Sequence, residues 1–170
     1  MIHAFKEKTP IIGKNVYIAP TALIIGNVII EDDCSIWPYA VLRGDDNIIH
    51  IKKGSNIQDH VMIHASHDAP TIIGEYVTIG HQACIHGAII HDRVIVGMKA
   101  TVLDKAEVLS DSMIGAHALV APKKVVQTNW LVMGVPAEYV KHLSQQQVAS
   151  IVENAKHYIE IKEIYRQENI

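Results

Sequence analysis

The sequence has 170 residues, of which 49% are hydrophobic but only 5% aromatic, so we expect one domain with an aliphatic core. A net charge of −3 and no basic cluster longer than two lysines argue against nucleic acid as a partner. No apolar stretch is long enough to span a membrane, and Lys6, Glu7 and Lys8 stand where a signal peptide needs an apolar run. We therefore expect a cytoplasmic protein.

An apolar repeat of six residues runs from Ile12 to Val132. Three joints break its phase, and each contains loop-forming residues, at 44–47, at 66–70 and at Gly87. The first joint adds three residues, the second adds four and the third removes one. We expect a loop at each joint. The repeat positions are Ile12, Ile18, Ile24, Ile30, Ile36, Leu42, Ile51, Ile57, Ile63, Ile73, Ile79, Ile85, Ile90, Val96, Val102, Val108, Ile114, Val120, Val126 and Val132.

A period of six fits neither an α-helix, which repeats its apolar stripe every three or four residues, nor a strand, which alternates every two. It fits a parallel β-helix in which three hexapeptides form one triangular coil of 18 residues. The repeat predicts a mainly β protein of six to seven coils, with one inward aliphatic side chain on each side of a coil.

The repeat ends at the segment Gly134–Ala137, where glycine and proline interrupt the strands. We therefore predict a β-helix domain over residues 1–137, followed over residues 138–170 by a linker and an α-helix of the same domain. Ser144 and Gln147 have the spacing of a capping box, and an apolar stripe at helical spacing continues to about Tyr165. The stripe predicts that the helix packs against the β-helix.

Counting in coils of 18 residues places one set of side chains in register. His64 and His86 differ by 22 positions, and four of these belong to the second joint, so they lie one coil apart. The same count places Arg43 one coil before His64. Stacked imidazoles about 4.8 Å apart can share one metal ion, because zinc–nitrogen bonds are about 2.0–2.1 Å long.

Asp59 and His81 form a second column on the neighbouring side of the coil, with Gln58 beside Asp59. His81 is thus on a different face from His64 and His86, and a rigid coil cannot bring all three together. A third histidine ligand would have to come from a neighbouring subunit. Cyclic symmetry in a homotrimer would create three identical metal sites of this kind.

These segments resemble the γ-class carbonic anhydrases, from about Thr9 to the C-terminal helix. The resemblance implies a left-handed β-helix and an active trimer with metal between subunits. The matching segments are Arg43-Gly44-Asp45, Asn56-Ile57-Gln58-Asp59, His64, Gly80-His81 and His86-Gly87. The implied roles are His64, His81 and His86 as ligands, Arg43 and Asp45 as an interface pair, Gln58 as the residue that orients the attacking hydroxide, and Asp59 as a support of the interface.

The implied reaction is the reversible hydration of CO₂ to bicarbonate. Zn²⁺ held by three neutral histidines lowers the pKa of its water to about 7, and Fe²⁺, Co²⁺ or Ni²⁺ would also suit an imidazole site. The chain lacks the acidic loop of the well-known archaeal form, which leaves Asp46, His67 and Asp68 as proton carriers. His67 matches best, since an ordinary histidine pKa is about 6.5. We also expect Tyr158 to approach the site from the helix.

Three other functions compete with this interpretation. Hexapeptide-repeat acyltransferases that use acetyl-CoA end in a similar Gly-x-Pro-Ala segment, which matches residues 134–137. A metal site could also hydrolyse acyl-CoA thioesters, and a trimer without activity could serve as a scaffold. Histidines in register across two faces favour the metal enzyme, because an acyltransferase needs one catalytic histidine and no metal triad.

Overall fold

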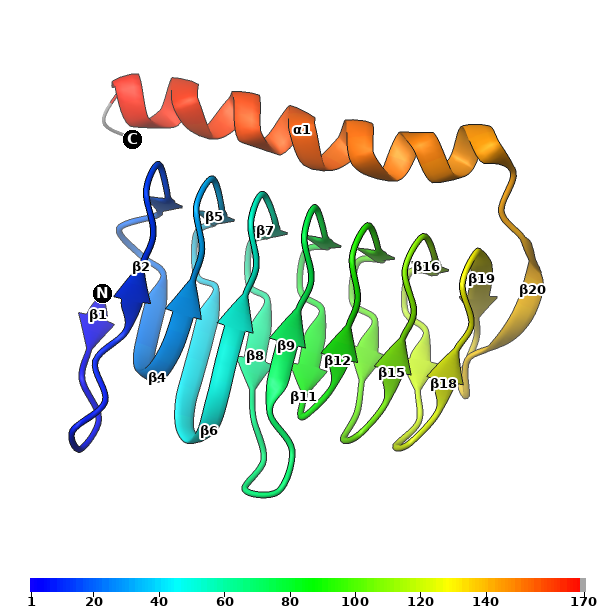
Figure 1. Cartoon of the computed structure of the whole chain (residues 1–170), viewed down its shortest axis with the longest axis horizontal. Helices are drawn as coiled ribbons and strands as arrows, with labels where there is room; N and C mark the ends of the chain where they lie inside the picture. The colour runs from blue at the N-terminus through cyan, green and yellow to red at the C-terminus, as the bar shows by residue number, and fades with distance from the viewer. Residues whose placement is uncertain (169–170) are drawn as a thin grey trace.

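The computed structural model describes residues 1–168 as a parallel β-helix of about seven turns with one C-terminal helix (Figure 1). This confirms the mainly β fold predicted from the six-residue repeat. Within residues 1–168, no helix is both long and apolar enough to cross a membrane.

Two hydrogen-bonded sheets form the three walls of the β-helix. The 12-stranded sheet covers two walls, because β6 pairs with β8 near its start and with β9 near its end. Its strands are β1 (Ile2–His3), β2 (Ile11–Ile12), β4 (Leu23–Ile30), β6 (Val41–Ile51), β8 (Met62–His64), β9 (Thr71–Ile73), β11 (Cys84–His86), β12 (Ile89–Ile90), β14 (Thr101–Val102), β15 (Glu107–Val108), β17 (Leu119–Val120) and β18 (Val125–Val126). The 8-stranded sheet, here the helix wall, contains β3 (Tyr17–Ile18), β5 (Ser35–Ile36), β7 (Asn56–Ile57), β10 (Thr78–Ile79), β13 (Ile95–Val96), β16 (Met113–Ile114), β19 (Trp130–Met133) and β20 (Glu138–His142).

The core consists of the predicted repeat positions. From Ile24 to Val132, every repeat residue is at most 1% exposed. Ile12 and Ile18 are only partly buried, because they belong to the first coil, where the stacking ends. The coil register is also as predicted, since Ile63 pairs with Leu42 on one side and Ile85 on the other.

The corners contain a backbone feature that the sequence does not predict. The third residue after an inward repeat residue has a positive φ at most corners, even where it is Tyr39, His60 or Lys99. Such a φ costs a residue with a side chain about 1 kcal/mol or more. Hydrogen bonds between coils offset this cost: the Lys99 amide, for example, donates to the carbonyl of His81 at 2.9 Å.

Two segments differ from the expected loops and linker. Residues 44–47 do not form a loop, because β6 continues through them, and the added residues form a bulge where the register shifts opposite Gly26 and Val28. Within the expected linker, β20 pairs antiparallel with β19. The other two joints are irregular as predicted, with a turn at Ser66–Ala69 and a bend at Gly87.

Helix α1 (Gln145–Glu168) runs along the helix wall and returns to the first coils (Figure 1). The predicted capping box is present: the Gln147 amide donates to Ser144 Oγ at 3.2 Å, and the Ser144 amide donates to Gln147 Oε1 at 3.1 Å. Near its C-terminal end, the fully buried Lys162 donates from Nζ to the Asn15 carbonyl at 2.7 Å. This contact ties the helix to the first coil.

Candidate metal centre

The structure places Arg43, His64 and His86 in one column, because β6, β8 and β11 pair in the predicted register. The His64 Nδ1 and His86 Nε2 atoms lie 3.0 Å apart, and the His64 side chain is only 10% exposed. Two nitrogens on one tetrahedral zinc ion are about 3.3 Å apart when each bond is about 2.0–2.1 Å. The pair therefore fits a metal in both donor type and spacing.

Acidic side chains surround His64. Its Nε2 lies 2.9 Å from Asp45 Oδ1, and Arg43 donates to Asp45 Oδ2 at 2.5 Å. Arg43 and Asp45 therefore contact each other within one chain, and their place at a subunit interface stays a prediction. Burial raises the pKa of Asp45, but the hydrogen bonds from His64 and Arg43 outweigh it and leave that pKa below its ordinary value. Within residues 1–168, Asp45, Asp46 and His64 offer ligand atoms that all lie within 4.8 Å of one another.

His86 has a carboxylate partner that the sequence reasoning missed. Its Nδ1 lies 3.0 Å from Asp104 Oδ2, and Ser66 Oγ donates to Asp104 Oδ1 at 2.6 Å. The Ser66 hydrogen bond, with that from His86, lowers the pKa of Asp104 against the opposing effect of burial. Asp104 is 18 residues after His86, so coil counting could have found it.

The second predicted column lies at the corner that follows the helix wall. His81 Nδ1 is 2.8 Å from Asp59 Oδ2, and the His81 backbone amide donates to Gln58 Oε1 at 3.1 Å. A hollow of about 180 Å³ brings Gln58 and His81 together with Tyr158 of α1 and the exposed Met98. Burial, followed by the charge of Asp59, raises the pKa of Tyr158, so its hydroxyl stays protonated at neutral pH.

A chain of polar contacts fixes the Gln58 amide. Gln58 Nε2 donates to Asn56 Oδ1 at 3.1 Å, and Asn56 Nδ2 donates to Thr78 Oγ1 at 2.8 Å. The Thr78 hydroxyl donates in turn to Asn154 Oδ1 of α1 at 2.8 Å. Sequence reasoning quoted Asn56 only as part of a matching segment and gave no role to Asn56, Thr78 or Asn154. The available signal was a polar residue directly before an inward isoleucine on a wall covered by the helix.

Two of the three predicted proton carriers lie in the turn at Ser66–Ala69. His67 is exposed there, and its carbonyl accepts a hydrogen bond from Asn47 at 3.2 Å. Asp68 pairs with Lys105, whose hydrogen bond and charge lower the pKa of Asp68 and make it a poorer base. Asp46 is exposed beside Asp45.

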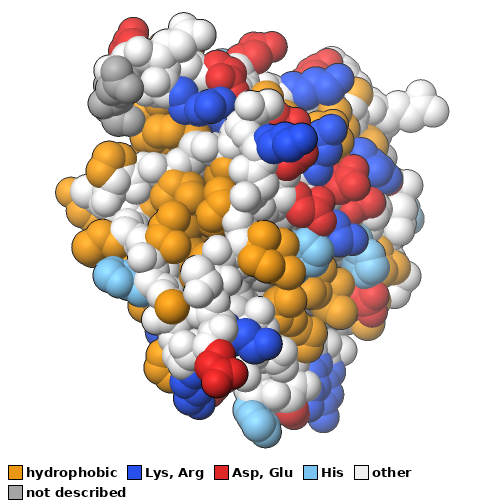
Figure 2. Space-filling view, turned by 60° about the vertical axis from the view of Figure 1, so that its left-hand side comes forward, with side chains coloured by type: hydrophobic (Ala, Val, Ile, Leu, Met, Phe, Trp, Pro, Cys, Tyr) orange, Lys and Arg blue, Asp and Glu red, His pale blue; other side chains and the backbone are white. Residues whose placement is uncertain are grey.

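One chain does not assemble all three predicted ligands. His64 and His86 belong to strands of the 12-stranded sheet, whereas His81 follows β10 of the helix wall. Within residues 1–168, the group of possible ligands around His64 contains Asp45 and Asp46 but neither His81 nor His86. Histidine side chains reach the surface beside apolar patches and charged groups in Figure 2.

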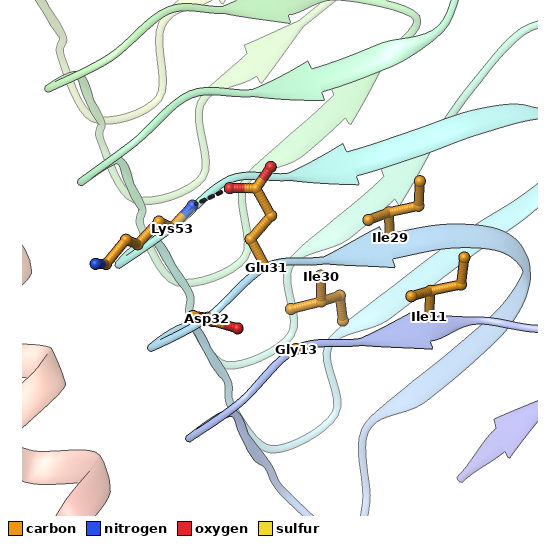
Figure 3. A pocket seen from close by; sticks show the side chains of 7 residues that line it. All are labelled: Ile11, Gly13, Ile29, Ile30, Glu31, Asp32 and Lys53. Carbon is orange, nitrogen blue, oxygen red and sulfur yellow. Dashed lines mark hydrogen bonds between the residues drawn. The ribbon is translucent and has the colours of Figure 1, made fainter.

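A separate hollow of about 330 Å³ opens between the first coils (Figure 3), lined by Ile11, Ile29, Glu31 and Lys53 among others. Its Glu31 carboxylate is already engaged, because Oε1 lies 2.7 Å from His50 Nε2 and Oε2 accepts from the Lys53 amide at 3.1 Å. No predicted site residue lines this hollow.

The chain resembles several known proteins. A family model for the bacterial transferase hexapeptide (six repeats) matches residues 9–44. A Methanocaldococcus jannaschii protein named "Probable carbonic anhydrase" is 48% identical over 89% of this chain and 96% of its own length. The chain belongs to the γ-class carbonic anhydrase-like family. The carbonic anhydrase of Geobacillus kaustophilus is 37% identical over 98% of this chain and 91% of its own length.

Other relatives of this γ-class protein differ in length or in name. The mitochondrial gamma carbonic anhydrase 2 of Arabidopsis thaliana is 38% identical over 96% of this chain, but the chain spans only 61% of that relative. A Bacillus cereus structure, provisionally described as an acetyltransferase, superposes with a TM-score of 0.95 at 33% identity, covering 98% of this chain and 96% of that one. The fold therefore does not separate the two activities.

Proposed function

We propose that this protein hydrates CO₂ reversibly to bicarbonate at a metal site shared between subunits of a homotrimer. The observation that carries the proposal is the 3.0 Å approach of His64 Nδ1 to His86 Nε2. His81 of a neighbouring subunit would complete the ligand set, with Zn²⁺, Fe²⁺, Co²⁺ or Ni²⁺ as the ion. When bound, the ion would act as a Lewis acid that lowers the pKa of a water molecule, to about 7 for zinc.

Gln58 would orient the reacting oxygen. Gln58 is 4% exposed, and Asn56 accepts from one of its two amide N–H groups, which leaves the other to donate to an oxygen in the hollow. Tyr158 lines the same hollow as a protonated donor. His67 or Asp46 would carry protons to buffer, because Asp68 is held by Lys105.

Exposed apolar side chains beside each half of the site support the trimer. Met62, on the strand of His64, is 41% exposed, and Met98, one coil after His81, is 57% exposed. Contiguous exposed apolar surface marks protein contact sites, whereas single exposed apolar residues are common on monomers, so the trimer rests mainly on the division of the three histidines between two faces. In the proposed trimer, Asp59 beside His81 would support this contact.

Mixing subunits tests the proposal. His81→Ala and His64→Ala variants should each lose bound metal and CO₂ hydration as pure proteins. Unfolding and refolding them together should restore metal and activity at those interfaces where an intact His64 and His86 meet an intact His81. Well-mixed trimers without recovered metal would contradict a shared site.

Acyl transfer is the second candidate, because the Bacillus cereus relative is described as an acetyltransferase. Incubating the purified protein with acetyl-CoA and amine or hydroxyl acceptors, while measuring free coenzyme A, distinguishes the two. Release that depends on the acceptor and survives His64→Ala would favour acyl transfer. Release that needs no acceptor and is lost in His86→Ala would indicate thioester hydrolysis at the metal site.

A further inference from the structure

Three successive coils meet at the Asp104 carboxylate. Ser66 comes from the coil of His64, His86 from the next coil, and Asp104 from the coil after that. Asp104 Oδ2 lies 3.0 Å from His86 Nδ1, and Asp104 Oδ1 accepts from Ser66 Oγ at 2.6 Å. Both carboxylate oxygens are therefore engaged, which fixes the plane of the carboxylate.

We propose that Asp104, held by Ser66, is a positioning residue that fixes the His86 ring for metal binding. A neutral imidazole has one N–H group, and a carboxylate at Nδ1 accepts it. The lone pair then remains on Nε2, which faces His64 Nδ1 at 3.0 Å. Metal-binding histidines commonly donate their other N–H to a carboxylate in this way. The inference rests on the proposed metal site and adds a residue to it.

Gly87 provides the space that this contact needs. A Cβ atom at Gly87 would lie 2.7 Å from Asp104 Oδ1 and 2.8 Å from Ser66 Oγ, and its φ of +55° is one that side chains rarely adopt. The Gly87 carbonyl also accepts from the Lys105 amide at 2.6 Å, which holds the backbone next to Asp104. A glycine directly after His86 therefore leaves the room that the Asp104–Ser66 pair occupies.

Each of the three predicted ligands has its own carboxylate: Asp45 at His64, Asp59 at His81 and Asp104 at His86. The Asp104 contact differs from the Asp45 contact, because Asp45 also binds the Arg43 guanidinium whereas Asp104 binds a neutral hydroxyl. The negative charge of Asp104 is therefore shared between His86 and a neutral hydroxyl, whereas that of Asp45 is shared between His64 and an arginine.

Competition of the assembled protein with a chelator for Zn²⁺ tests the role of Asp104. We expect Asp104→Ala to weaken Zn²⁺ binding by about 10- to 100-fold and to change the visible absorption spectrum of the Co²⁺-loaded protein. Asp104→Asn, whose carbonyl can still accept from Nδ1, should recover most of the affinity. Glu107→Ala is the matched control, since it removes a similar carboxylate from His91 on another wall, where the two atoms lie 2.7 Å apart.

The outcomes separate this inference from the proposed function. Wild-type protein that binds no Zn²⁺ would contradict the metal site itself. If wild-type protein and Asp104→Ala bind Zn²⁺ equally well, only the role of Asp104 is overturned. The same holds if Asp104→Asn binds Zn²⁺ no better than Asp104→Ala, or if Glu107→Ala is weakened to the same extent as Asp104→Ala. If Asp104→Ala fails to fold, Ser66→Ala provides the test. We expect this variant to bind Zn²⁺ a few-fold more weakly than wild type. An unchanged Zn²⁺ affinity would overturn the role of Asp104.

Discussion

His64 Nδ1 and His86 Nε2 face each other at 3.0 Å on adjacent coils, although 22 residues separate them in the sequence. If this pair binds metal, the metal should stabilise the fold, because an ion that binds only the native state adds about 2.7 kcal/mol at 100 times its dissociation constant. We expect chelator-treated protein to unfold at a lower temperature than Zn²⁺-loaded protein. His86→Ala should remove that difference, and a metal-induced shift that persists in His86→Ala would place the ion elsewhere.

The assembly should depend on the exposed methionine next to His81. Met98→Glu would bury a charge in the proposed contact, so we expect smaller particles by light scattering and loss of bound metal. Ile89→Glu is the control, because Ile89 is 37% exposed on a wall that carries none of the predicted ligands. An intact trimer in Met98→Glu would exclude this surface from the interface.

The inward and outward residues of one strand should differ sharply in their effect on stability. Val126 is fully buried, whereas its neighbour Val125 is 40% exposed. We expect Val126→Ala to lower the free energy of unfolding by about 2 kcal/mol and Val125→Ala to change it by less than about 0.5 kcal/mol. Chemical denaturation measures both, and equal effects would contradict the inward register of β18.

The coil count predicted much of the core and of the histidine column, because stacking converts sequence distance into spatial neighbours. The count was correct for His64 and His86, because the joints are visible in the sequence as breaks in the six-residue phase. It also placed Asp59 and His81 in one column, and their side chains do meet at 2.8 Å.

The remaining features depend on information that the period does not contain. Asn154 reaches Thr78 because of the position of α1 along the helix wall. The six-residue repeat does not determine that position. Tyr39 and Lys99 have a positive φ, which residues with a side chain disfavour, because the stacking of the coils requires it. The added residues after Gly44 fit into a bulge, because neighbouring strands can continue past them.

The polar chain behind Gln58 should affect activity rather than metal content. Thr78→Val removes the hydroxyl that accepts from Asn56 and donates to Asn154, so we expect CO₂ hydration to fall about tenfold with bound metal unchanged. Thr78→Ser keeps the hydroxyl and should retain most of the activity. Stopped-flow hydration assays with metal analysis measure both, and equal losses in the two variants would indicate a packing defect instead.

The contact that ties α1 to the first coil should depend on pH through Glu163. Lys162 donates to Glu163 Oε1 at 2.5 Å, and this hydrogen bond, despite partial burial, holds the pKa of Glu163 below its ordinary value. A carboxylate whose pKa is lowered by folding stabilises the native state fully above its unfolded pKa of about 4.3. That contribution disappears as the pH falls through the lower folded value. We expect Glu163→Gln to be less stable than wild type at pH 7, by roughly 1 kcal/mol or less because Glu163 is partly exposed.

The same variant should converge with wild type in acid, where the wild-type carboxyl is protonated and also neutral. Thermal unfolding followed from pH 7 down to the acid limit of the fold measures this difference. Glu160→Gln on the exposed side of the same helix is the matched control and should follow wild type throughout. A Glu163→Gln difference that stays constant as the pH falls would mean that Glu163 acts through packing, and that its charge does not hold Lys162 in place.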